Sequence, residues 1–293
     1  MKFLTCIGGG ETSTETIRFG LMIAKAFNAD VSLLYVQPHF PHAVRQEMKL
    51  AREKLSEWQI DLPGVEVLHA AQAILLEEQF LKTTDSGEVV QKHALKAAIR
   101  GAHEIHLYGT RGEDVRLRLR DGDIISEVNA EVESAQHDLV ILGASQQRRL
   151  LHKLIHFVNC SMLIVKNPKQ VRYELLICTD GSPASRKAEV FGIRLAQSLG
   201  AIVQLLSVAR SRNREHAAME EAERVSKSMA KASVHYTIAV RVGKMVDAVA
   251  ELAREDTLVV LGTSPVSELR KLLFGSIPTR IIHRINCPIL IVQ

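Results

Sequence analysis

The sequence has no long apolar run and few cysteines. No segment reaches the ~20 apolar residues of a membrane-spanning helix, and the N-terminal MKFLTCIGGGE lacks the apolar stretch of a secretory signal. We therefore expect a cytoplasmic protein without a membrane span. The four cysteines, Cys6, Cys160, Cys178 and Cys287, form no C-x-x-C pair. This spacing favours small buried side chains over a zinc site or a redox pair.

The sequence also lacks a strong charge of either sign. The formal net charge is +4 over 293 residues, and 24% of residues are charged against 46% hydrophobic. The small basic excess is spread along the chain, so it predicts no nucleic-acid partner. The composition is that of an ordinary globular protein long enough for two domains.

The chain repeats itself. When the sequence is shifted by 172 positions, residues 4–36 fall on residues 176–208, and twelve of these 33 positions are identical. Two shorter pairs of segments also match: LVILGAS at 139–145 with LVVLGTS at 258–264, and HFVNCSMLIV at 156–165 with HRINCPILIV at 283–292. A repeat of this length indicates two whole domains. We predict them at 1–168 and 171–293.

Strands alternate with helices in the second half. The predicted strands are 174–179, 202–208, 235–240, 258–261 and 289–292, and the predicted helices are 182–198, 214–232, 245–254 and 277–285. This alternation predicts an α/β fold with a parallel sheet. In such sheets ligands bind beyond the carboxyl ends of the strands, where the strand order reverses.

The first half is longer than the second between its second and fourth strands. We expect at least one extra helix in the additional stretch, 70–106, and assign it no function. VRLRLR at 115–120 predicts an alternating strand, followed by a helix to about residue 134.

The sequence contains two closely spaced histidine pairs, and histidine is a common metal ligand. His103 and His106 are three positions apart, and His152 and His156 are one helical turn apart. No acid or third histidine joins either pair at a recognisable spacing, so we interpret both as structural.

Two turns in the second half carry groups that suit an anion or a sugar. Gly275-Ser276 open the helix 277–285, whose free N–H groups and dipole favour an anion. Asp180 follows the first strand in CTDGSPAS at 178–185. Its carboxylate suits either hydroxyl groups of a ligand or the cap of the following helix, and the sequence alone leaves both interpretations open.

The segment GTSPVSELRKLLFGS at 262–276 resembles the universal stress protein family. Nucleotide-binding members carry Gly, two residues, Gly, nine residues and Gly-Ser or Gly-Thr, and this spacing is kept with Pro265 in place of the second glycine. The Asp180 turn, the Leu-rich second strand and the closing CPILIV are also similar. The resemblance covers all of the second domain and both ends of the first. It implies two tandem Rossmann-like domains of the adenine nucleotide alpha hydrolase type.

The resemblance also implies one ATP- or AMP-type nucleotide in the second domain, with Mg²⁺ accompanying ATP. The family's aspartate at the position of Asp180 binds the ribose, and the residue at the position of Val208 lies near the base. The matching nucleotide-binding positions are Thr179, Asp180, Val208, Leu261, Gly262, Gly275, Ser276 and Ile277.

The first domain lacks the matching groups. Gly8 stands at the position of Asp180. Only four residues, ASQQ, separate Gly143 from the arginines that align with Gly275-Ser276, against twelve in the second domain. Two independent parts of one site are missing together, so we predict that the first domain has kept the fold and lost the ligand.

No nucleophile or base can be assigned from spacing, so we expect a stress-response module with an unidentified protein partner rather than an enzyme. Two alternatives stay open: a nucleotide-independent interaction scaffold of the same family, and a slow ATPase.

The last strands of the two domains, within 161–166 and 288–293, are apolar edges, which are an aggregation hazard unless paired. Family members commonly pair these strands between subunits, and a tandem chain holds both at high effective concentration. We predict an intramolecular pseudo-dimer; a further homodimer stays open. The residues expected at its seam are Met162, Ile164, Ile289 and Ile291.

Pro265→Gly is expected to tighten ATP binding, because it restores a backbone donor to the loop. A hydrogen bond to a charged oxygen contributes about 1.5–3 kcal/mol, or about one to two decades of affinity. Gly275→Val is expected to abolish binding by blocking backbone approach to the phosphates. Calorimetric titration checks both, and wild-type affinity in both variants would place the phosphates elsewhere.

Overall fold

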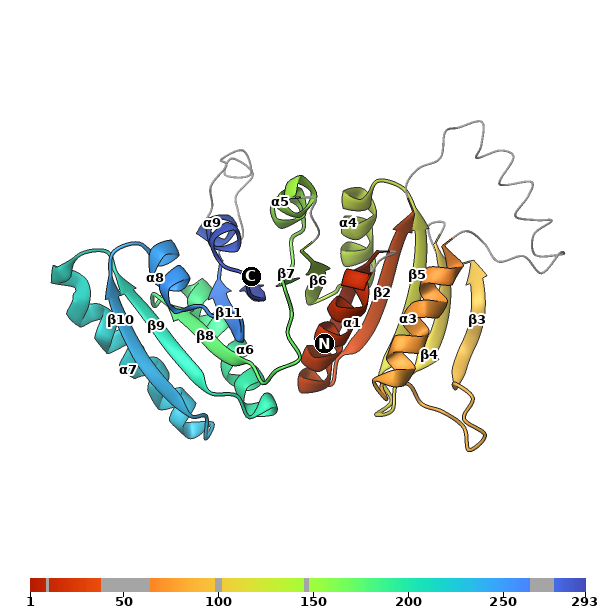
Figure 1. Cartoon of the computed structure of the whole chain (residues 1–293), viewed down its shortest axis with the longest axis horizontal. Helices are drawn as coiled ribbons and strands as arrows, with labels where there is room; N and C mark the ends of the chain where they lie inside the picture. The colour runs from red at the N-terminus through yellow and green to blue at the C-terminus, as the bar shows by residue number, and fades with distance from the viewer. Residues whose placement is uncertain (9–10, 38–63, 98–101, 145–147, 264–276) are drawn as a thin grey trace. The chain divides into compact units, whose positions relative to one another are not determined.

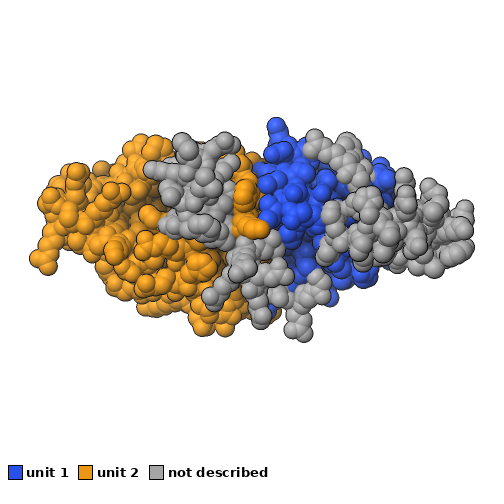
Figure 2. Space-filling model, turned by 90° about the horizontal axis from the view of Figure 1, so that it is seen from above, with its two compact units in different colours: residues 1–24, 28–137 blue, residues 25–27, 138–293 orange. Residues whose placement is uncertain are grey.

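The computed structural model describes residues 1–8, 11–37, 64–97, 102–144, 148–263 and 277–293. The chain forms two compact units (Figure 2). Unit 1 contains residues 1–24 and 28–137, and unit 2 contains residues 25–27 and 138–293. These units are defined by contacts between residues, whereas the predicted domains 1–168 and 171–293 are defined by the sequence repeat. The domain bounds therefore stay a prediction.

The sheet of unit 1 combines parallel and antiparallel strands. Its strand order is β1(Lys2–Ile7), β2(Asp30–Gln37), β5(Asp114–Asp121), β4(His103–Tyr108) and β3(Gln91–Ala97). The first three are parallel, and β4 and β3 each run antiparallel to their neighbours. The described helices that start in this unit are α1(Glu11–Phe27), α3(Val65–Glu77) and α4(Ile124–Ala135).

The described part of the inserted stretch 70–106 contains the end of one helix, turns, and two strands. A helix is present only in its first residues, where α3 ends at Glu77, while β3 and the start of β4 follow. The expected extra helix therefore does not account for the stretch. The strands are set by a period of two in β4 and β5, whose apolar residues alternate with charged ones and bury one face of the sheet.

Unit 2 carries the predicted alternation of strands and helices (Figure 1). Its strand order is β10(Tyr236–Val242), β9(Val203–Ala209), β8(Glu174–Thr179), β11(Thr257–Gly262), β12(Ile289–Val292), β7(Ser161–Val165) and β6(Leu139–Gly143). The helices are α5(Arg148–Phe157), α6(Pro183–Leu199), α7(Glu215–Lys231), α8(Met245–Leu252) and α9(Ile277–Arg284), and a short 3-10 turn, η2, spans Arg212–Arg214. The predicted α/β class and tandem parallel sheets are confirmed, with antiparallel exceptions at β3, β4 and the β7–β12 pair.

The sequence of α6 explains both of its ends. Ser182 caps its start by accepting a hydrogen bond from the Ser185 backbone N–H at 3.1 Å, and Pro183 occupies the first turn, where no N–H is needed. Gly200 ends the helix in the left-handed conformation, with φ 59°.

The predicted seam between the two last strands is confirmed. β12 pairs with β7 in antiparallel register, with Ile289 opposite Ile164, Leu290 opposite Leu163 and Ile291 opposite Met162. All six side chains are at most 2% exposed. The apolar edges thus cover one another within a single chain.

Lys166, just after β7, ties this strand to the last helix. Its Nζ donates to the carbonyl oxygen of Ile282 at 3.1 Å and also to that of Ile285. These carbonyls lie at the carboxyl end of α9, where a cation is favoured by the helix dipole.

Leu163→Ala is expected to lower the free energy of unfolding by about 2–5 kcal/mol, because it empties the centre of this seam. Denaturant titration of the full chain measures the change. Leu76→Ala is the matched control, since Leu76 is 41% exposed on α3 and its truncation should have little effect. Equal effects of the two substitutions would contradict a packed seam.

Candidate functional site

The carboxyl ends of three adjacent strands form the candidate site. The parallel register places Thr179 of β8 beside Ser207 of β9, and Ile177 of β8 beside Val260 of β11. The chain runs from β8 to β9 on one side and returns to β11 on the other, so the strand order reverses between β8 and β11. This reversal marks the usual ligand position in such a sheet.

Five of the sequence-predicted residues come together at this edge. They are Thr179, Asp180, Val208, Leu261 and Gly262. Ile277 begins α9 and is 51% exposed. Gly275, Ser276 and Pro265 lie outside the described residues, as do residues 145–147 of the shortened loop in the first domain.

Asp180 is an exposed carboxylate in the turn after β8. Its Oδ1 accepts a hydrogen bond from the Ser182 backbone N–H at 3.0 Å, while Ser182 itself caps α6. The helix-cap interpretation of Asp180 is therefore wrong. The turn partly desolvates the carboxylate, but hydrogen bonds from Ser182 and Ser185 outweigh this effect and lower its pKa. Asp180 is thus charged at neutral pH.

Two predicted site residues have buried side chains. Thr179 is fully buried, and Leu261 is 5% exposed within the core that α8 and α9 cover. A ligand at this edge meets only their backbone groups. Val208 is half-buried at the end of β9, so part of its apolar side chain faces outward.

Gly262 is required by packing. A Cβ atom at this position would lie 2.1 Å from the carbonyl oxygen of Ala184 and 2.7 Å from the backbone nitrogen of Ser185. The first turn of α6 therefore rests directly on the end of β11. This helix contact explains the glycine without reference to a phosphate group.

A hydrogen-bonded group centred on the buried Glu189 contacts the turn, and sequence reasoning missed it. Thr179 Oγ1 donates to Glu189 Oε1 at 2.6 Å, and Arg224 Nη2 donates to Glu189 Oε2 at 2.6 Å. Arg224 also binds Glu221, whose carboxyl group lies against Gly181 in its left-handed conformation, with φ 75°. The network fixes the turn that carries Asp180.

The corresponding turn of the first domain has lost this polarity. The 172-position shift places Ile7 on Thr179 and Ile17 on Glu189, and both isoleucines are buried. The turn itself is closed by Ser13, whose Oγ accepts from the Gly8 N–H at 2.9 Å and donates to the Gly8 carbonyl at 2.8 Å. The self-comparison already contained this signal, because Glu189 is a charged residue aligned with an aliphatic one.

The cysteines do not contribute chemistry at neutral pH. Burial raises the pKa of all four thiols to about 12, so they remain protonated. The side chains of His152 and His156 lie outside the described part of the chain. Among the described helices, none combines the length and apolar character needed to cross a membrane.

Comparison with known proteins agrees with this architecture. The sequence model of the universal stress protein family matches residues 1–166 and again residues 174–293. The chain belongs to the universal stress protein family. It is a tandem member, because the family model matches each half separately.

Solved structures show the same fold over the whole chain. A universal stress protein from Archaeoglobus fulgidus superposes with a TM-score of 0.61 at 14% identity, covering 100% of this chain and 96% of its own. A functionally unknown protein from Pseudomonas aeruginosa superposes with a TM-score of 0.59 at 13% identity, covering 99% and 92%. A search of curated proteins found no match.

Gly262→Ala is expected to destabilise this universal stress protein by at least about 1–3 kcal/mol, because its Cβ would overlap backbone atoms of α6. Thermal or denaturant unfolding measures the loss. Gly8→Ala is the matched control, since a Cβ there would have Ser13 Oγ as its nearest contact, at 3.5 Å. A Gly262→Ala protein as stable as the control would refute the packing role.

Proposed function

We propose that the second domain, residues 171–293, binds one ATP- or AMP-type nucleotide, and that the chain acts as a non-enzymatic stress-response module. The observation that carries this proposal is the convergence of Asp180 and Val208 at the carboxyl ends of β8 and β9, beside the point where the strand order reverses. Universal stress protein membership supports the choice of ligand class.

The described groups suit a ribose and a base. Asp180 is charged and exposed, and a carboxylate accepts several hydrogen bonds, so the bond from Ser182 leaves capacity for ribose hydroxyls. The half-buried Val208 offers apolar surface for a base. Gly275 and Ser276 are assigned to the phosphates by resemblance alone, and Mg²⁺, when bound with ATP, would neutralise phosphate charge.

The non-enzymatic part of the proposal rests on the carboxylates. Glu189 is 4% exposed and engaged by Thr179 and Arg224. Asp180 has a lowered pKa, which makes it a weak base. Glu189 is therefore occupied by its partners, and Asp180 is a poor general base.

The first domain is proposed to bind no nucleotide. Its turn places Gly8 where the second domain has a carboxylate, and Ile7 and Ile17 replace the buried polar pair. Calorimetric titration of the full chain with ATP and Mg²⁺ is therefore expected to give one site per chain. A stoichiometry near two would contradict this assignment.

Asp180→Asn is expected to weaken nucleotide binding by about tenfold to a hundredfold, because it removes the charged acceptor. The asparagine oxygen can still accept from the Ser182 N–H, so the turn should persist. The same titration measures the affinity.

Glu255→Gln is the matched control, because Glu255 is 67% exposed and precedes β11, at the opposite end of that strand. It should bind like the wild type. Absence of binding in the folded wild-type chain would favour the nucleotide-independent scaffold instead.

A further inference from the structure

The inserted strands of unit 1 carry a polar cluster with no counterpart in the second domain. β4 and β5 bury Ile105 and Leu117 on one face, while Glu104, His106 and Arg118 point to the other. This second face is also shielded, because His106 is 4% and Glu104 7% exposed. Buried polar groups need partners, so their arrangement indicates a specific role.

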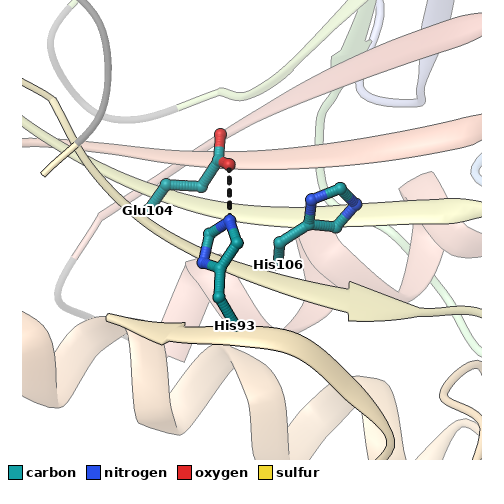
Figure 3. A group of neighbouring side chains, drawn as sticks. All are labelled: His93, Glu104 and His106. Atoms are coloured by element: carbon teal, nitrogen blue, oxygen red, sulfur yellow. Dashed lines mark ion pairs between the residues drawn. The ribbon is translucent and has the colours of Figure 1, made fainter. Parts of the chain in front are cut away.

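Strand register brings three potential ligands onto one face. His93 of β3 lies directly opposite His106 of β4, and Glu104 precedes His106 by two residues on the same strand. One ligand atom from each of these three residues lies within 4.8 Å of the other two (Figure 3). The signal was absent from the sequence, because His93 and His106 meet only through the register of β3 with β4, which no local spacing encodes.

Hydrogen bonds orient both imidazole rings toward the centre of the cluster. His93 Nδ1 is 3.0 Å from the carbonyl oxygen of Ala94, and His106 Nε2 is 3.0 Å from Asp114 Oδ1. Both partners accept, so these two nitrogens carry the protons. In a neutral ring the lone pairs then belong to His93 Nε2 and His106 Nδ1. Figure 3 shows the former facing Glu104 and one nitrogen of His106 turned toward the other two side chains.

Glu104 is oriented in a similar way. Arg118 binds its Oε2 at 2.6 Å, and the remaining oxygen, Oε1, lies 3.4 Å from His93 Nε2. Arg118 also pairs with the fully buried Glu131, so its charge is shared between two carboxylates. Support of each ligand by an outer hydrogen-bond partner is the usual construction of a protein metal site.

We infer that His93, Glu104 and His106 bind a divalent transition-metal cation of the Zn²⁺ class, with Asp114 as a positioning residue. Two imidazoles and one carboxylate suit Zn²⁺ and disfavour Mg²⁺ or Ca²⁺. Ligand atoms of a tetrahedral zinc site are about 3.3 Å apart, close to the His93–Glu104 spacing of 3.4 Å.

Binding requires only a small closure of the cluster. His93 lies on the edge strand β3, whose pairing with β4 is irregular on both sides of this residue. Its side chain is 17% exposed, which gives solvent a route to a fourth coordination position. A proton on His93 Nε2 gives the ion pair drawn in Figure 3, and the cation would replace this proton.

The test is titration of chelator-treated full-length protein with Zn²⁺, with Mg²⁺ as the contrasting probe. The wild type should bind one Zn²⁺ per chain, and His93→Gln should lower the Zn²⁺ affinity at least tenfold. Mg²⁺ should not compete for the site. His69→Gln is the matched control, because His69 is exposed on α3. Equal Zn²⁺ affinity in both variants, or no Zn²⁺ binding by the wild type, would leave an ion pair only and overturn the inference.

Two further measurements separate ligation from a structural role. X-ray absorption of the wild-type zinc complex should show two imidazoles and no sulfur, and a sulfur ligand would overturn the assignment. Asp114→Ala should lower Zn²⁺ affinity about tenfold to a hundredfold without removing a ligand. Unchanged affinity in this variant would exclude Asp114 as a positioning residue. Neither result depends on nucleotide binding by the second domain.

Discussion

The antiparallel pairing of β7 with β12 is the contact on which the second unit depends. β12 has only four residues, and it is flanked by β11 on one side and by the last strand of the first repeat on the other. Without β7, its N–H and C=O groups and its apolar side chains would form an open edge. Lys166 extends this dependence to α9, whose terminal carbonyls it binds. The seam therefore supports both the final strand β12 and the helix α9 that precedes it.

The two repeats share the turn after their first strand but differ in the residues that support it. In the second, the buried Thr179 and Glu189, with the partly exposed Arg224, support a turn with a charged aspartate. In the first, Ile7 and Ile17 fill the same positions. An apolar pair packs without desolvating any charge, so it carries no desolvation cost. The second repeat instead buries the Glu189 carboxylate, which Thr179 and Arg224 compensate by hydrogen bonds.

The first repeat instead has its buried charges on β4, β5 and α4. Arg118 and Arg120 of β5 both bind Glu131 of α4, and Arg118 continues to Glu104 of the inserted β4. Each buried charge meets an opposite charge, which is the condition under which such groups are tolerated. Glu104 connects these ion pairs to the histidine cluster, because it binds Arg118 and also lies 3.4 Å from His93 Nε2. The buried charges of the first repeat therefore lie away from the turn that the two repeats share.

The tandem repeat and the α/β class were predictable from the sequence, because periodicity and self-similarity are shared by every residue in a segment. The pairing of the last strands was predicted from the family resemblance and from the apolar character of these strands. The sequence also identified Asp180 and Gly262, although it could not show that Ser182 is the cap or that Gly262 is needed by Ala184. Only the tertiary structure decided which polar residues meet. Glu189 of α6 accepts a hydrogen bond from Arg224 of α7, and His93 of β3 lies opposite His106 of β4. Helix packing and strand register set these contacts, and local sequence spacing does not encode them.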